Sequence, residues 1–162
     1  MGRNPKYFIG GDNGCTGSWC VLDSDGNILL LEKTPVKKTD KGKRVNCQKL
    51  VEMLSPYSKN AVAVLERPMI FPHRFKSSIS AAKSHEACCI ALEMCSIHYD
   101  VIDSRRWQNV LFSDKRYKKL STKQASRTLG EELYPEVKDS KLKDFDALLM
   151  AYWLKNNNTK LK

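Results

Sequence analysis

The segment that most constrains the fold is YFIGGD, residues 7–12, an uncharged and mostly apolar run that ends in an acid. Such a run predicts a short buried β-strand with the carboxylate of Asp12 at its carboxyl end. Gly14 and Gly17 then provide a turn. The next segment, SWCVL at residues 18–22, predicts a second strand that folds back on the first.

The chain continues this antiparallel unit and then leaves it. DSDGN at residues 23–27 is typical of a tight turn, and ILLLEKT at residues 28–34 predicts a third strand, which completes a meander. KKTDKGKR at residues 37–44 is polar and basic, so we expect a mobile loop there. Apolar residues at helical spacing predict a helix over residues 47–57.

A second acid ends the next predicted strand. AVAVLE at residues 61–66 is a continuous apolar run that ends in Glu66, as expected of a central strand covered on both faces, and Pro68 stops it. A helix predicted over residues 77–95 leads to a strand at residues 99–102, which makes a β-α-β crossover. The helix residues expected to face the core are Ile79, Ala82, Ala87, Ile90, Ala91 and Met94.

Two helices are predicted to close the fold. Ser121 or Thr122 can cap a helix that stops before Pro135, and residues 144–154 predict a last, amphipathic helix. The fold class is therefore α/β, with a mixed five-stranded sheet (three antiparallel strands, then parallel strands) flanked by helices. We expect one domain over residues 1–155 and a polar tail over residues 156–162.

The acids at these positions predict a metal site. Central strands of an α/β sheet open into a crevice at their carboxyl ends, so Asp12 and Glu66 can face one site, and Asp146 on the last helix can join them. Carboxylates this close would raise one another's pKa unless cations neutralised them, and oxygen ligands select Mg²⁺ or Mn²⁺. Two such ions about 4 Å apart can promote hydrolysis of a phosphodiester.

The composition favours a nucleic-acid partner. The chain has 162 residues, with 28 Lys and Arg against 18 Asp and Glu, a formal net charge of +10. This charge suits a phosphate-rich ligand; no apolar run is long enough to span a membrane, and no basic helix has a clean apolar face. The first residues lack a secretory signal core, so we expect a cytoplasmic protein with six reduced cysteines.

Three blocks of the chain resemble the acidic motifs of RuvC-type Holliday junction resolvases, members of the ribonuclease H-like superfamily. The blocks are IGGDNGCTG at residues 9–17, VLERP at residues 64–68 and DFDALLMA at residues 144–151. DSRRW at residues 103–107 and STKQA at residues 121–125 are also similar to this family, especially to its phage and organellar branches. The resemblance extends over residues 7–154.

The resemblance implies a ribonuclease H-like fold and a homodimer that places paired nicks in a four-way DNA junction. It implies that Asp12, Glu66 and Asp146 hold two Mg²⁺ or Mn²⁺ ions, and that the protein acts on branched DNA, in a host cytoplasm if it is phage-encoded. Bacterial members carry an acid or His where this chain has Lys143, so Asp144 is the best available fourth ligand.

A second departure concerns the junction contact. Many bacterial relatives have an aromatic residue three positions after the second acid, where this chain has Met69, and Phe71 or Phe75 can substitute for it. Lys119 and Lys123 lie near a predicted helix start, where backbone N–H groups attract phosphate. The full set of expected DNA-binding residues is Arg67, Phe71, Arg74, Phe75, Lys76, Arg105, Arg106, Lys119 and Lys123.

Each acid also has a structural alternative. Asp12 can be a turn residue, Glu66 can pair with Arg67, and Asp144 and Asp146 can be first-turn acids favoured by the helix dipole. At the level of function, three hypotheses stay open. They are a junction-selective DNA endonuclease, a related nuclease on RNA–DNA hybrids or flaps, and a basic nucleic-acid-binding module without turnover.

Overall fold

A five-stranded sheet with the strand order β3-β2-β1-β6-β7 forms the centre of the molecule. The computed structural model describes residues 5–157. Strand β1 pairs antiparallel with β2 and parallel with β6, and β6 pairs parallel with β7. The predicted arrangement of a meander followed by parallel strands is therefore confirmed. The strands are β1 (Tyr7–Gly11), β2 (Ser18–Asp23), β3 (Ile28–Lys33), β6 (Ala61–Glu66) and β7 (His98–Ile102).

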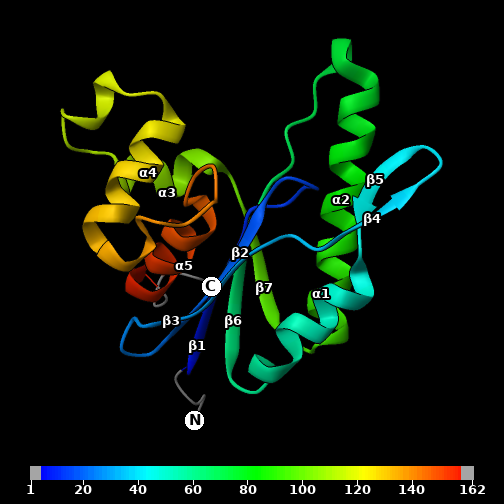
Figure 1. Cartoon of the computed structure of the whole chain (residues 1–162), viewed down its shortest axis with the longest axis horizontal. Helices are drawn as coiled ribbons and strands as arrows, with labels where there is room; N and C mark the ends of the chain where they lie inside the picture. Colours follow the sequence, from blue (N-terminus) through cyan, green and yellow to red (C-terminus); the bar gives the residue numbers. More distant parts are fainter. Residues whose placement is uncertain (1–4, 158–162) are drawn as a thin grey trace.

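Helices cover both faces of this sheet (Figure 1). Successive side chains of β1 point to opposite faces of the sheet. Phe8 and Ile9 therefore lie in two separate buried cores. The core around Ile9 includes α1 and α2, and the core around Phe8 includes α3, α4 and α5. The helices are α1 (Cys47–Leu54), α2 (Phe75–Met94), α3 (Ser104–Leu111), α4 (Thr122–Leu133) and α5 (Asp146–Asn157).

Helix α5 lies directly on β1, and a glycine makes this contact close. A Cβ added at Gly10 would overlap the backbone carbonyl oxygen of Ala147 and crowd the backbone nitrogen of Ala151. Most residues of α5 are fully buried, so the predicted amphipathic pattern is wrong for this helix. The helix begins at Asp146 rather than residue 144 and continues through Asn157, two residues past the predicted domain boundary.

The segment expected to be a mobile loop is instead a β-hairpin. Its strands are β4 (Val36–Thr39) and β5 (Gly42–Val45), which pair antiparallel and form a separate two-stranded sheet beside α2 (Figure 1). Almost all of its side chains are exposed, so no apolar alternation marks the strands in the sequence.

The structure also contains helix α3, which the sequence pattern does not predict and which begins after an Asp103 N-cap.

Helix α2 buries a face that overlaps the predicted one only in part: Ala91 is fully buried, as predicted, whereas Ala82 is exposed. Ile79, Ile90 and Met94 are exposed by 39%, 41% and 66%, so their predicted burial is wrong. Small residues such as Ser84 and Cys88 face the core instead. Both sides of this helix carry apolar residues, and hydrophobic spacing alone cannot choose between them.

Two predictions about composition can be compared with the structure. All six cysteines are free, as predicted. Among residues 5–157, no helix is long and apolar enough to cross a membrane. Four short 3₁₀ helices connect the larger elements: η1 (Ser55–Tyr57), η2 (Pro72–Arg74), η3 (Tyr117–Lys119) and η4 (Pro135–Val137).

Candidate active site

Asp12 and Glu66 lie at the same end of the sheet, directly after the carboxyl ends of the adjacent parallel strands β1 and β6. The β1–β6 register pairs Gly11 with Leu65, so the two acids occupy the next positions along their strands. The side-chain Nδ2 of Asn13 donates a hydrogen bond to the backbone carbonyl oxygen of Glu66. This bond ties the segment after β1 to the end of β6 and holds the two acids in register.

Asp146 reaches this end of the sheet from the first position of α5. The neighbouring Phe145 is fully buried, and its backbone N–H donates to Ser126 Oγ at 3.1 Å, which anchors the helix start to α4. The close contact between α5 and Gly10 then places Asp146 near the end of β1. Asp144 precedes the helix and has no helical conformation, which is the geometry predicted for a fourth acid at this site.

The carboxylates interact electrostatically, as their pKa values show. The pKa of Asp12 rises to about 8, first through burial and then through the negative charges of Asp146, Glu66 and Asp144. The pKa of Glu66 rises to about 7, first through burial and then through Asp146, Asp103 and Asp144. The ionised forms of Asp12, Glu66 and Asp146 are therefore disfavoured by burial and by neighbouring acids, Asp144 among them.

The pKa of Asp146 rises less, to about 6. Burial is the main cause, and the charge of Asp144 adds to it, whereas a hydrogen bond with Ser126 and the positive charge of Lys123 oppose it. Lys123 also lowers the pKa of Asp12. The side chain of Lys123, in the first turn of α4, therefore lies beside the acidic cluster and partly neutralises it.

The acids of this cluster suit a divalent cation by their chemistry rather than by a finished geometry. Among residues 5–157, no three His, Cys, Asp or Glu side chains converge closely enough to form a ready metal-binding group. The donors are nevertheless hard carboxylate oxygens that repel one another, the set that Mg²⁺ and Mn²⁺ prefer. In addition, Asp146 Oδ1 is buried without a hydrogen-bond partner in the described chain. If the side chains of these neighbouring acids rotated, they could bind a cation together, and Asp146 Oδ1 would gain a partner.

Trp107 is a site residue that the sequence did not indicate. It is fully buried. Its indole group lies beside Glu66, where it acts to lower the pKa of that acid against the effect of burial. The indole nitrogen nevertheless lacks a hydrogen-bond partner of good geometry in the described chain. Its N–H is thus available to Glu66 after a small movement.

The alternative in which Glu66 only forms an ion pair with Arg67 is not supported. The salt bridges in residues 5–157 involve Arg116 and Arg127, and none includes Glu66 or Arg67. Arg67 instead lines a cavity of about 330 Å³ next to the site, together with Phe71 and Arg105. Three of the expected DNA-binding residues therefore share one pocket at the end of the sheet where the acids lie.

The other expected DNA-binding residues are dispersed. Arg74 lies 5.8 Å from the ring of Phe71, and Phe75 is 71% exposed at the start of α2. The guanidinium of Arg106 lies 5.5 Å from the ring centre of Trp153, and this cation–π contact within the protein explains its position without DNA. Lys119 is in η3 rather than at the first turn of α4, and Lys76 lines a separate basic cavity between the β4–β5 hairpin and α2.

Comparison with known proteins gives the fold its name. No protein-family model and no curated protein matches this chain. Among solved structures, the RuvC structure of Thermus thermophilus is similar with a TM-score of 0.66 and 15% identity, over 94% of this chain and 95% of that one. The structure of T. thermophilus RuvC in complex with a Holliday junction substrate is similar with a TM-score of 0.66 and 13% identity, over 90% and 92% of the two chains. The chain therefore has the RuvC-like, ribonuclease H-like fold that its sequence motifs predict.

Proposed function

We propose that this protein is a divalent-metal-dependent endonuclease that cleaves phosphodiester bonds in branched DNA, with four-way junctions as its preferred substrate. The observation that carries the proposal is the meeting of Asp12, Glu66 and Asp146, from three separate elements, at one end of the sheet with mutually raised pKa values. The similar RuvC structure that was determined with a Holliday junction substrate supports the choice of DNA. We assign the whole activity to a single domain.

In this proposal Asp12, Glu66, Asp146 and Asp144 would hold Mg²⁺ or Mn²⁺. The bound cations would supply an activated water and stabilisation of the leaving oxygen. The chain itself orients the acids: Asn13 anchors Glu66 through its backbone, and Ser126 anchors the start of α5. These two bonds fix the backbone that carries Glu66 and Asp146 before substrate binds.

Basic and aromatic residues around this end of the sheet would hold the DNA. Lys123 lies beside the acids and in the first turn of α4, where backbone N–H groups also favour an anion. Lys119, Arg67 and Arg105 are exposed nearby and suit phosphate contacts. The exposed ring of Phe75 can stack on an unpaired base at the branch point, with Phe71 as the alternative for this role.

The proposed active form is a homodimer. A monomer has one carboxylate cluster, whereas resolution of a four-way junction needs two opposed nicks. Helix α2 supports a dimer because Phe75, Ile90 and Met94 leave apolar surface exposed along one long helix. An interface of this kind predicts a concentration-dependent molecular mass near twice that of the chain.

The direct test is cleavage of labelled DNA in Mg²⁺. We expect wild-type protein to nick a four-way junction faster than a flap, a linear duplex or an RNA–DNA hybrid of matched sequence. Asp12→Asn and Glu66→Gln should bind the junction and leave it intact, since each removes a charged ligand with almost no change in volume. Preferred cleavage of the hybrid or flap would favour the second nuclease hypothesis, and binding without cleavage in Mg²⁺ and Mn²⁺ would favour a module without turnover.

A further inference from the structure

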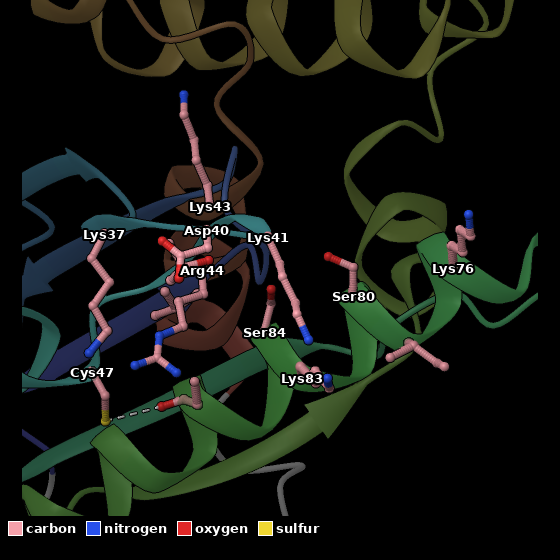
Figure 2. A pocket seen from close by; sticks show the side chains of 14 residues that line it. Lys37, Asp40, Lys41, Lys43, Arg44, Cys47, Lys76, Ser80, Lys83 and Ser84 are labelled. Carbon is pink, nitrogen blue, oxygen red and sulfur yellow. Dashed lines mark hydrogen bonds between the residues drawn. The ribbon is translucent and has the colours of Figure 1, made fainter.

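A basic groove lies between the β4–β5 hairpin and helix α2. Its volume is about 830 Å³, and it is distinct from the smaller cavity beside Glu66. Figure 2 shows the hairpin on one side and α2 on the other, with Lys37, Lys41 and Arg44 extending from the hairpin toward the helix. The cationic residues that line it are Lys37, Lys41, Lys43, Arg44, Lys76 and Lys83, and the acidic one is Asp40.

The groove concentrates positive charge that the protein does not neutralise. Within residues 5–157, the salt bridges use Arg116 and Arg127, and none of the groove cations takes part in one. All of these cations are exposed, so they can meet a ligand from solvent. Like charges gathered around one cavity repel each other unless an anion enters it. A polyanion therefore fits this surface better than a neutral or cationic ligand.

The walls of the groove are held by contacts that join them to the active-site segment. Cys15, three positions after Asp12, donates from its Sγ to the Lys43 carbonyl oxygen at 3.6 Å and lies 3.7 Å from Ser84 Oγ on α2. At the base of the groove, Cys47 Sγ contacts the Ala87 carbonyl oxygen at 3.6 Å (Figure 2). The loop that follows the first acid thus contacts both walls, and the groove opens next to the cleavage site.

Cationic and hydroxyl groups on the two walls suit a phosphodiester backbone. Lys37, Lys41 and Arg44 extend from the hairpin toward α2, and Ser80 and Ser84 add hydroxyl groups from the helix (Figure 2). Backbone contacts of this kind come from Lys, Arg and Ser side chains and carry no sequence information. The cations lie on two separate elements, the hairpin and α2, as a chain-like anion requires.

We infer that the groove between the β4–β5 hairpin and α2 binds the phosphodiester backbone of the DNA substrate where it leaves the cleavage site. This inference rests on the proposed nuclease function, because that function supplies the polyanion and its position. The substrate would then be held on two sides of the acids, by Lys123 and its neighbours on α4 and by the hairpin groove beside α2.

The test compares two triple variants with the same loss of charge. K41A/R44A/K83A removes three groove cations, and K33A/K49A/K59A removes three exposed lysines outside the groove. Binding to a four-way junction and to a linear duplex is measured in EDTA, so that cleavage plays no part. We expect the groove variant to lose roughly tenfold or more in affinity for both DNAs and about 2 units of the log–log salt slope. The control variant should lose much less of either.

Two further measurements keep the inference independent of folding defects and of the nuclease activity. K41R/K83R should retain affinity, since the charge is kept. In wild-type protein, DNA should protect Lys41 and Lys83 from an amine-reactive reagent while Lys33 and Lys59 stay reactive, as read by mass spectrometry. Equal losses in the two triple variants, or no protection, would overturn the groove assignment. So would a groove variant that loses binding to phosphatidylserine vesicles but not to DNA. If the wild-type protein binds DNA in the groove but does not cleave it in Mg²⁺ or Mn²⁺, only the nuclease proposal would be overturned.

Discussion

Gly10 of β1 and Ala147 of α5 lie in backbone contact, with no room for a side chain between them. This contact is what brings the start of the last helix to the end of the first strand. Asp146 immediately precedes Ala147, and Asp12 lies two residues after Gly10, so one close approach positions two acids.

Gly10→Ala should therefore damage stability and the proposed activity together. The added methyl group must displace α5 from β1, and overpacking of this kind costs about 1–3 kcal/mol of unfolding free energy. We expect a lower Tm in thermal unfolding and slower junction cleavage at temperatures where the variant is still folded. A variant with the wild-type Tm and the wild-type cleavage rate would show that neither stability nor cleavage depends on the close contact between α5 and β1.

Asp144→Asn should lose at least about tenfold in cleavage rate, equivalent to about 1.4 kcal/mol of transition-state stabilisation. The reason is that Asp144 lies before α5 and its charge raises the pKa values of Asp12, Glu66 and Asp146, which places it in the cluster. We expect Mn²⁺ to restore part of the loss. Lys143→Ala is the matched control and should change the rate only modestly. Normal cleavage by Asp144→Asn beside an inactive Lys143→Ala or Asp139→Asn would move the fourth group elsewhere.

The stability of the protein in EDTA should fall as the pH rises from about 4 to 8. The pKa of Asp12 rises from 3.8 to about 8 in the folded state, so between these values the folded chain binds a proton that the unfolded chain has released. Unfolding free energy then decreases with pH. Glu66 and Asp146, with pKa values of about 7 and about 6, act in the same direction.

Thermal unfolding across this pH range provides the measurement. Asp12→Asn should flatten the dependence in EDTA, since the substituted amide does not titrate. Mg²⁺ should raise the Tm most at pH 8, because fewer protons compete with the cation for the carboxylates there. A Tm that is constant or rises from pH 5 to 8 in EDTA would contradict the burial and mutual repulsion of these acids.

Lys123→Ala should weaken DNA binding with a reduced salt dependence. If Lys123 neutralises one phosphate, its removal lowers the log–log slope of affinity against salt by up to about 0.9. The same substitution removes a positive charge that lowers the pKa values of Asp12 and Asp146. The Tm in EDTA at pH 8 should therefore fall as well. Lys138→Ala, an exposed lysine after η4, serves as the control and should leave the slope unchanged.

Much of the fold could be predicted because its signals are local. Continuous apolar runs before Asp12 and Glu66 predict buried strands, and the structure has β1 and β6 at those residues. Of the two expected caps of α4, Ser121 and Thr122, Ser121 is the one observed. Its Oγ accepts from the Gln124 backbone N–H, and Gln124 Oε1 accepts from the Ser121 backbone N–H. Strand ends and helix caps depend on neighbouring residues, so the order of residues carries the information.

The hairpin and the orientation of α2 could not be predicted in this way. The exposed strands around Lys41 have neither an apolar face nor an alternating pattern, so the basic run is indistinguishable from a loop by periodicity. Helix α2 has apolar residues on two sides, and only its packing against α1 and the sheet selects the side with Cys88. The groove between these two elements therefore has no signature in the sequence beyond its charge.

The sequence by itself determined which elements end in acids, and the resemblance of its three acidic blocks predicted their shared role. Only the tertiary structure decided how near the acids lie, since that distance depends on the register of β1 with β6 and on the room that Gly10 leaves for α5. It likewise decided that Trp107 and Lys123 act on these acids. The physical reason is that strand ends and helix starts are local properties of the chain, whereas burial and charge interaction depend on distances between residues far apart in sequence.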